Sequence, residues 1–146
     1  MPDLRKDPIV GRWVIIASER GRRPQDFAIS KEIVEPSFCP FCPGHEGMSP
    51  PEILSLKTAG GGWSVRVVPN KFPFFHIEGE FDRRPEGMYD VMQALGAHEI
   101  VVESPDHREH LATLEPSQIR NVLLAYRMRL DLRVRVVPSA IPQFLL

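Results

Sequence analysis

The sequence WSVRVV at residues 63–68 has the period-two alternation of a β strand. The side chains at positions 63, 65 and 67 would share one face of this strand, and those at 64, 66 and 68 would share the other. Valine favours extended backbone. Pro69 follows directly and cannot donate a hydrogen bond to a neighbouring strand. We therefore predict a β strand that spans 63–68 and stops at the proline.

Two further segments predict strands because they are rich in β-branched residues: RWVIIA at 12–17 and HEIVVES at 98–104. The segment PSQIRNVLLAYRMRL at 116–130 predicts a helix, since Pro116 suits a first turn and apolar residues recur at helical spacing. The apolar positions on the predicted helix face are Ile119, Val122, Leu123, Tyr126 and Leu130.

Loops are predicted at the three consecutive glycines of 60–62 and over 78–96. The predicted elements run as strands followed by a helix, without the regular alternation of strand and helix that builds a parallel sheet. The order therefore predicts the α+β class, with an antiparallel sheet and a packed helix.

The composition is that of a soluble globular protein. The chain has 146 residues, of which 42% are apolar and 25% charged, and this suits one domain with a sizeable core. A formal net charge of −1 argues against a general nucleic-acid or membrane-surface binder. No apolar run approaches the roughly 18 residues that a membrane span needs. We therefore predict a cytoplasmic protein with no nucleic-acid partner and no membrane partner.

Both cysteines lie in SFCPFCPGHE at 37–46, three residues apart. The pair could be a zinc knuckle, a redox dithiol, or incidental cysteines in a structural loop. A thioredoxin-type dithiol opens a helix with its second cysteine, whereas Gly44 and the nearby prolines oppose a helix here. A rigid loop that offers two of the four ligands of a tetrahedral zinc ion is the better interpretation. The residues alone do not choose the other ligands among His45, His76, His98, His107 and His110.

Two loops carry candidate ligand-binding residues. SERGRRP at 18–24 sets arginines beside a glycine, which suits phosphate oxygens, although a solvated charged loop is the simpler alternative. In VVPNKFPFF at 67–75, two prolines flank Asn70 and Lys71. Asn70 could bond a ribose hydroxyl or a base edge, or it could form an Asx turn that closes the strand over phenylalanines.

Four blocks together, GRWVIIASERGRRP, FCPFCPGHE followed by PPEI, WSVRVVPNKFP and HEIVVESPDH, resemble the N-terminal half of galactose-1-phosphate uridylyltransferases. The resemblance covers about residues 5 to 133. It implies a histidine-triad-like antiparallel half-domain and a homodimer for the full-length family member. It also implies transfer of a uridylyl group between UDP-glucose and a sugar 1-phosphate, as part of galactose metabolism. A related branch of the family acts on ADP-sugars as a phosphorylase.

The resemblance also assigns roles to residues of this chain. Cys39, Cys42 and His107 match three zinc ligands. Lys71 stands where some members carry an acidic residue, beside an asparagine at the nucleoside. The residues implied in binding the UDP-sugar are Arg20 and Arg23 at the phosphates, Asn70 and Lys71 at the nucleoside, and Phe41, Val68 and Ile100 around the base.

The family mechanism that the resemblance implies uses a histidine nucleophile in a His-Pro-His element. The five histidines here are 31, 22, 9 and 3 positions apart, so no such element exists. We expect residues 1–133 to be an N-terminal domain of this family. We expect 134–146 to be an atypical apolar tail, so that the half-domain is incomplete at its C-terminus. Two functions stay open: part of a nucleotidyltransferase that is inactive alone, or a zinc-stapled nucleotide-binding or assembly module without catalysis.

Overall fold

The structure, a computed structural model, describes residues 2–17 and 39–136. These residues form two compact units. The first unit contains described residues 2–17 and 72–98, and the second contains 39–71 and 99–136.

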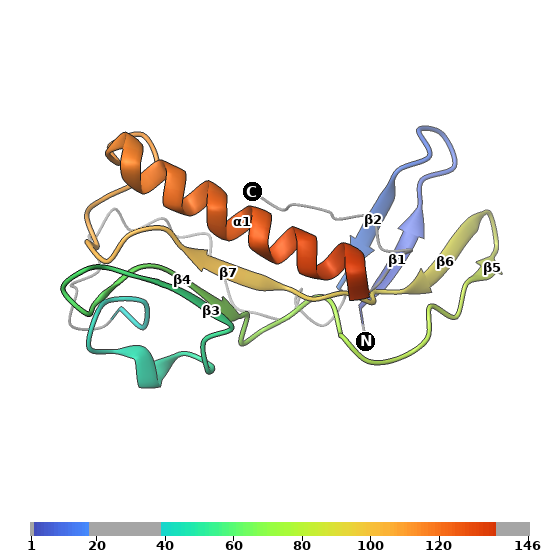
Figure 1. The fold of residues 1–146 in the computed structure, drawn as a ribbon. Coiled ribbons are helices and arrows are strands. Elements are labelled where there is room, and N and C mark those ends of the chain that lie inside the picture. The colour runs from blue at the N-terminus through green and yellow to red at the C-terminus, as the bar shows by residue number, and fades with distance from the viewer. Residues whose placement is uncertain (1, 18–38, 137–146) are drawn as a thin grey trace, which may run out of the picture. The chain divides into compact units, whose positions relative to one another are not determined.

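The first unit is a four-stranded antiparallel sheet in the order β2-β1-β6-β5. Its strands are β1 (Asp3–Lys6), β2 (Trp13–Ile16), β5 (Arg84–Glu86) and β6 (Tyr89–Gln93). The predicted strand at 12–17 is confirmed as β2, whereas β1 had no prediction. β1 pairs with β2 on one side and with β6 on the other, so the sheet joins residues that are far apart in the chain (Figure 1).

The prediction of a loop over 78–96 is wrong, because β5 and β6 lie within it. Glu86 pairs with Tyr89, which leaves a two-residue turn whose first member, Gly87, has φ +62°. Arg83 forms an ion pair with Asp90 across this hairpin. Pro85 is tolerated because β5 is the edge strand of the sheet.

The second unit holds a three-stranded antiparallel sheet in the order β3-β4-β7. The strands are β3 (Leu54–Lys57), β4 (Trp63–Pro69) and β7 (Glu99–Val102), and a short 3-10 helix, η3 (Glu46–Met48), precedes them. The predictions at 63–68 and 98–104 are confirmed. The first six residues of β4 are all buried, because α1 covers one face of this sheet and the segment around η3 covers the other (Figure 1).

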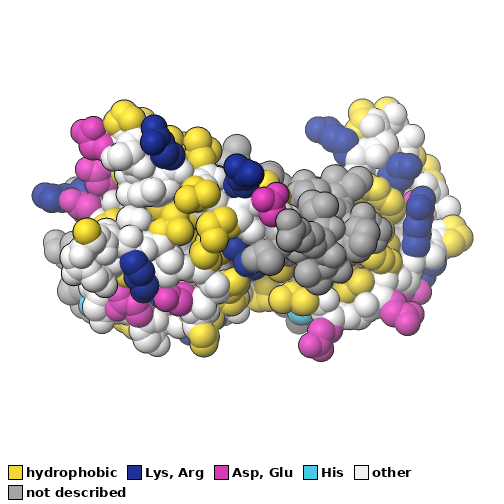
Figure 2. All heavy atoms as spheres, in the orientation of Figure 1, with side chains coloured by type: hydrophobic (Ala, Val, Ile, Leu, Met, Phe, Trp, Pro, Cys, Tyr) yellow, Lys and Arg dark blue, Asp and Glu magenta, His cyan; other side chains and the backbone are white. Residues whose placement is uncertain are grey.

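Helix α1 (Pro116–Val136) confirms the predicted helix and extends it. Its side chains pack on β4 in a core of Val65, Val67, Leu114, Val122 and Ala125. The prediction that Leu123 faces the core is wrong, since 60% of this residue is exposed. The small Ala125 takes that place, and hydrophobic side chains reach the surface along α1 (Figure 2).

The predicted common face for positions 63, 65 and 67 is wrong at Trp63. The register pairs Leu56 with Val65 and Lys57 with Trp63, so Ser64 is an extra residue and forms a β-bulge. Adjacent residues of β3 point to opposite faces, and their partners do the same. Trp63 therefore turns away from α1 and donates its indole N–H to Glu46 Oε1 at 3.0 Å.

The combined α+β prediction is confirmed, with two antiparallel sheets and one long helix among the described residues. α1 crosses the predicted boundary between 133 and 134 and continues to Val136. The rest of the predicted apolar tail, 137–146, lies outside the described residues. Among the helices of the described ranges, none has the length and apolar content needed to span a bilayer.

The packing of this core predicts that truncating the side chain of Val122 will lower the stability of the chain. Val122 has no exposed surface and sits in the α1–β4 core. Val122→Ala should lower the free energy of unfolding by about 2 kcal/mol, because it removes two buried carbons and leaves a cavity. Urea denaturation would measure the difference. The matched control is Leu123→Ala on the exposed side of the same helix, where we expect a change within about 0.5 kcal/mol. Equal losses in the two variants would contradict this packing.

Candidate functional site

The cysteine pair lies in a tight series of backbone turns at the start of the described part of the second unit. The amide of Cys42 donates to the carbonyl of Cys39 at 3.4 Å, and the amide of His45 donates to the carbonyl of Cys42 at 3.1 Å. Gly44 has φ +88°, a left-handed conformation that suits glycine. These turns aim both sulfurs to the same side, as the predicted knuckle requires.

The segment after β7 is shaped by its own polar side chains. Ser104 Oγ accepts the amide of Asp106 at 3.1 Å, and Asp106 Oδ1 accepts the amide of Arg108 at 3.0 Å. The carboxylate also pairs with the Arg108 guanidinium, and hydrogen bonding to this residue is the main reason that the pKa of Asp106 is lowered. These bonds fix the backbone at Asp106 and Arg108, on either side of His107, and the ring of His107 is directed at the cysteines.

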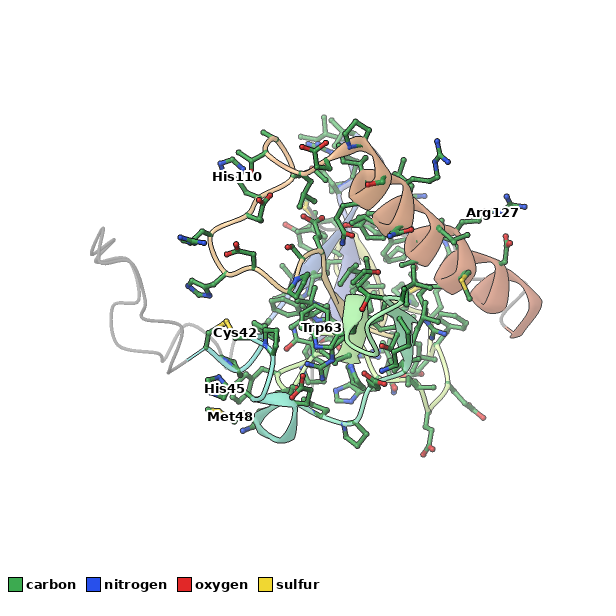
Figure 3. All side chains as sticks on the ribbon, turned by 60° about the vertical axis from the view of Figure 1, so that its left-hand side comes forward. Cys42, His45, Met48, Trp63, His110 and Arg127 are labelled. Carbon is green, nitrogen blue, oxygen red and sulfur yellow. The ribbon has the colours of Figure 1, made fainter. Side chains whose placement is uncertain are left out.

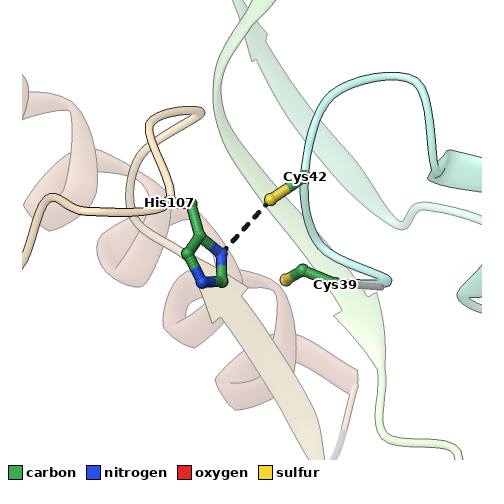
Figure 4. Close-up of side chains that lie close together, drawn as sticks. All are labelled: Cys39, Cys42 and His107. Atoms are coloured by element: carbon green, nitrogen blue, oxygen red, sulfur yellow. Dashed lines mark hydrogen bonds between the residues drawn. The ribbon is translucent and has the colours of Figure 1, made fainter. Parts of the chain in front are cut away.

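Cys39, Cys42 and His107 come together in the structure (Figure 4). Cys42 Sγ lies 3.3 Å from His107 Nδ1, and the ligand atoms of all three residues lie within 4.8 Å of one another. Zinc bonds of about 2.3 Å to sulfur and about 2.0 Å to nitrogen, at tetrahedral angles, place such atoms roughly 3.5 Å apart. The cluster therefore has the donors and the spacing to hold a metal ion. Within the described ranges, no fourth histidine, cysteine or acidic side chain joins the group.

The electrostatics of the cluster favour a cation. Burial is the largest cause that raises the pKa of the Cys42 thiol, followed by its hydrogen bond with Cys39 and the charges of Cys39 and Asp106. Two thiolates so close together repel each other in the absence of a positive charge. A metal ion reverses this balance, because a coordinating thiol gives up its proton.

The other histidines have different partners. His45 Nδ1 donates to the carbonyl of Cys39 at 2.8 Å, so this ring braces the backbone of a candidate ligand. His98 Nδ1 accepts the amide of Phe74 at 3.2 Å in the first unit, and the exposed His110 bonds Thr113. His76 is exposed in the first unit. Among the five, the geometry selects His107, a choice that spacing alone left open.

The residues predicted around a nucleotide base are only partly brought together. Val68 on β4 and Ile100 on β7 are direct partners in the sheet register. Their neighbours Val67 and Val101 pack on the α1 side, so Val68 and Ile100 face the other side. Phe41, which stands between the two cysteines in the sequence, is half-buried.

The polar members of the predicted nucleotide site lie just past the end of β4 or outside the described residues. Asn70 is half-buried directly after β4, and Lys71 is exposed. Arg20 and Arg23 lie outside the described residues.

One group of polar residues beside the cysteine loop had no prediction from the sequence. Arg66 points away from α1 and meets Ser49 and Glu52 of the segment that follows the knuckle. The available signal was a single arginine in a strand of valines, with acidic residues in the preceding loop.

Comparisons with known proteins find relatives that match most of this chain. No protein-family model matches the chain. The chain is 34% identical over 135 residues to the ADP-glucose phosphorylase of Arabidopsis thaliana, a match that covers 89% of this chain. A crystal structure of that kind of enzyme from Arabidopsis thaliana, with bound ADP-glucose, has 32% identity and a TM-score of 0.56 over 92% of this chain. A uridylyltransferase structure has 25% identity and a TM-score of 0.60 over 95% of this chain. These relatives are an ADP-glucose phosphorylase and a uridylyltransferase, the kinds of protein that the four motifs of the sequence resemble.

These relatives confirm the resemblance seen in the four motifs, and the α+β half-domain matches its structural relatives. The chain spans 38% of the length of the curated relative, and 39% and 37% of the two solved chains. A further structure, a GalT-like protein from Arabidopsis thaliana, has 27% identity and a TM-score of 0.54. Members of the family are transferases and phosphorylases.

The buried position of Cys42 predicts unequal reactivity of the two thiols in the metal-free protein. Cys39→Ser leaves Cys42 as the single thiol, and Cys42→Ser leaves the half-buried Cys39. We expect Cys42 to react more slowly with a disulfide reagent at pH 7, because burial limits access and is also the largest cause that raises the pKa of this thiol, a cause that remains when Cys39 is replaced. Its rate should rise steeply as the pH increases through the raised pKa. Stopped-flow absorbance would measure both rates, and a faster Cys42 at neutral pH would contradict the geometry.

Proposed function

We propose that this chain is the zinc-stapled, sugar-nucleotide-binding part of a nucleotidyltransferase that uses a UDP-sugar and a sugar 1-phosphate. The observation that carries the proposal is the cluster of Cys39, Cys42 and His107, in which the contacting residues Cys42 and His107 are 65 positions apart in the chain. Similarity to the relatives supports a sugar nucleotide as the ligand, since one of them was solved with ADP-glucose bound.

Zinc is the metal that fits these donors. Two thiolates and an imidazole suit zinc better than magnesium or calcium, which take oxygen ligands. A bound zinc ion would neutralise the thiolates and cross-link the cysteine loop to the segment after β7. Structural zinc sites use four protein ligands, so a site with three from this chain should lose its metal readily to a chelator.

The nucleotide would lie on the face of β4 and β7 that is turned away from α1. Ile100 offers a half-buried, β-branched apolar surface for a base there, beside its buried partner Val68, and Phe41 comes from the cysteine loop. Asn70 and Lys71, just past the end of β4, would contact the nucleoside. Arg20 and Arg23 are proposed at the phosphates, where the guanidinium fork matches phosphate oxygens.

Binding, and not turnover, is the activity proposed for the chain alone. In the family mechanism, a histidine nitrogen bonds to the α-phosphorus of the sugar nucleotide, and the bond from that phosphorus to the sugar 1-phosphate breaks. The five histidines of this chain include no His-x-His element to provide that nitrogen. Purified chain that released sugar 1-phosphate from a nucleotide sugar would contradict this part of the proposal.

A specific observation favours ADP-glucose as a second candidate substrate. The identities with ADP-glucose phosphorylase are 34% and 32%, against 25% and 28% with the two uridylyltransferase structures. Lys71 also stands where some uridylyltransferases carry an acidic residue. Phosphorolysis of an ADP-sugar would use the same kind of nucleotide pocket, so binding of both nucleotide sugars must be compared.

Metal binding tests the cluster directly. The chain should bind one Co²⁺ and show the intense near-ultraviolet band of a cobalt–thiolate bond, and Zn²⁺ should displace the cobalt. His107→Ala should weaken Co²⁺ binding by tenfold or more, since it removes one of three protein ligands. His110→Ala is the matched control, because His110 is exposed and bonds Thr113 instead. Equal affinity of the His107 and His110 variants would contradict the proposed zinc site.

Ligand binding tests the nucleotide pocket. Titration calorimetry with ADP-glucose and with UDP-glucose should give saturable binding of at least one of them. Asn70→Ala should weaken that binding by about five- to tenfold, the loss expected for one hydrogen bond. Asn121→Ala on α1 is the control and should bind as the parent does, because α1 covers the opposite face of the sheet. Unchanged affinity in the Asn70 variant would exclude this residue from the pocket.

A further inference from the structure

Arg66 is a charged residue in the interior of the second unit. It lies in the middle of β4, and only 1% of the residue is exposed. Its Nε donates to Glu52 Oε2 at 3.3 Å, and its Nη2 donates to Ser49 Oγ at 3.2 Å. The guanidinium also lies over the ring of Trp63, 5.5 Å from its centre. Both hydrogen-bond partners belong to the segment that follows the cysteine loop.

Successive hydrogen-bonded turns lead from Cys39 to Ser49, which bonds this arginine. The amides of Cys42, His45 and Met48 each donate to the carbonyl three residues earlier. Ser49 continues the series, because its amide and its hydroxyl both donate to the carbonyl of Glu46. The same hydroxyl accepts from Arg66, so the last turn of the loop is tied to the sheet.

Trp63 strengthens the same attachment. It follows the bulge in β4, and its indole N–H bonds the carboxylate of Glu46 in η3. Figure 3 shows Trp63 beside the loop that carries Cys42, His45 and Met48. Glu52 pairs with Arg66 and also with Lys57, whose Nζ lies 3.5 Å from Glu52 Oε1. The hydrogen bond from Trp63 is the main cause that lowers the pKa of Glu46, and the charge of Arg66 is a smaller one.

Stability alone is a weak reason for this arrangement. Arg66 Nη1 is buried and has no hydrogen-bond partner among the described residues, which is unfavourable. Buried ion pairs are often no more stabilising than apolar side chains of the same size. Val68, two residues along and on the same face as Arg66, shows that a buried apolar residue fits this side of the strand. A charged group that meets the cysteine loop at this point instead fixes where the loop lies.

We propose that Arg66 is a positioning residue for the metal centre, holding the Cys39–Cys42 loop in its metal-binding conformation before a metal arrives. This inference rests on the proposed zinc site for its purpose, although the loop order that it describes exists without metal. Ser49 transmits the effect, since it joins the guanidinium to the turn that starts at Glu46. Loss of residues that orient metal ligands typically changes metal affinity by about 10- to 100-fold.

The experiment compares Arg66→Met with Arg129→Met. Arg129 is a half-buried arginine of the same unit, and it pairs with Glu99 through bonds of 2.9 and 2.8 Å that join α1 to β7. Two measurements are made on each variant of the full chain. Co²⁺ affinity is measured by competition with a chelator, and amide hydrogen exchange in the metal-free chain reports the bonds made by Cys42 and His45. Ser49→Ala is a third variant, in case Arg66→Met fails to fold.

We expect Arg66→Met to bind Co²⁺ about tenfold or more weakly than the parent chain. The amides of Cys42 and His45 should lose protection in this variant, while those of β4 and α1 keep it. Ser49→Ala should show the same pattern to a smaller extent, and Arg129→Met should bind Co²⁺ as the parent does.

The proposal is overturned if loop protection and Co²⁺ affinity in folded Arg66→Met stay within threefold of the parent. It is also overturned if Arg129→Met weakens both equally, or if Arg66→Met is unfolded and Ser49→Ala is unchanged. A parent chain that binds no Co²⁺ would instead refute the proposed zinc site. The exchange data would then still decide whether Arg66 orders the loop.

Discussion

Burial of β4 on both faces is the constraint on which the second unit depends. One face carries Val65 and Val67, which pack under α1 in a wholly apolar core. The other face carries Arg66, whose charge must be met by partners that cover it. A short three-stranded sheet buries too little surface to be stable by itself, so both covering layers are needed. The helix provides one layer, and the cysteine loop with η3 provides the other.

The candidate site follows from this layered arrangement. Because β7 is the neighbour of β4, the segment after β7 emerges beside the layer that the cysteine loop forms. The turn built by Ser104 and Asp106 then directs His107 back toward the sulfurs. The same register sets Val68 against Ile100 on the face away from α1. The proposed metal site and the proposed base site thus both depend on the pairing of β4 with β7. A shift in the register of this pair would disturb both sites.

The sequence predicted the elements whose signal is local. The β-branched alternation at 63–68, the helical spacing at 116–130 and the Cys-Pro-Phe-Cys loop each reflect physics within a few residues. The β5–β6 hairpin escaped prediction because it is polar, contains Pro85 and gains its order from pairing with β1. Trp63 was assigned to the wrong face because a bulge depends on the partner strand. His107 could be chosen among five histidines only by family resemblance or by three-dimensional proximity, since spacing along the chain does not encode a contact across 65 positions.

Within the second unit, the groups that would hold a nucleotide sugar are separable from the chemistry that would act on it. The cysteine loop, the turn at His107 and the apolar face of β4 and β7 are fixed by contacts inside this unit. None of those contacts requires a nucleophile. Arg66 illustrates why the separation is physically possible, because its charge and hydrogen bonds join β4 to Ser49 and Glu52 of the segment after the cysteine loop. In the proposed function, the site can therefore be formed before a ligand binds, and binding does not have to supply the free energy of folding the loop.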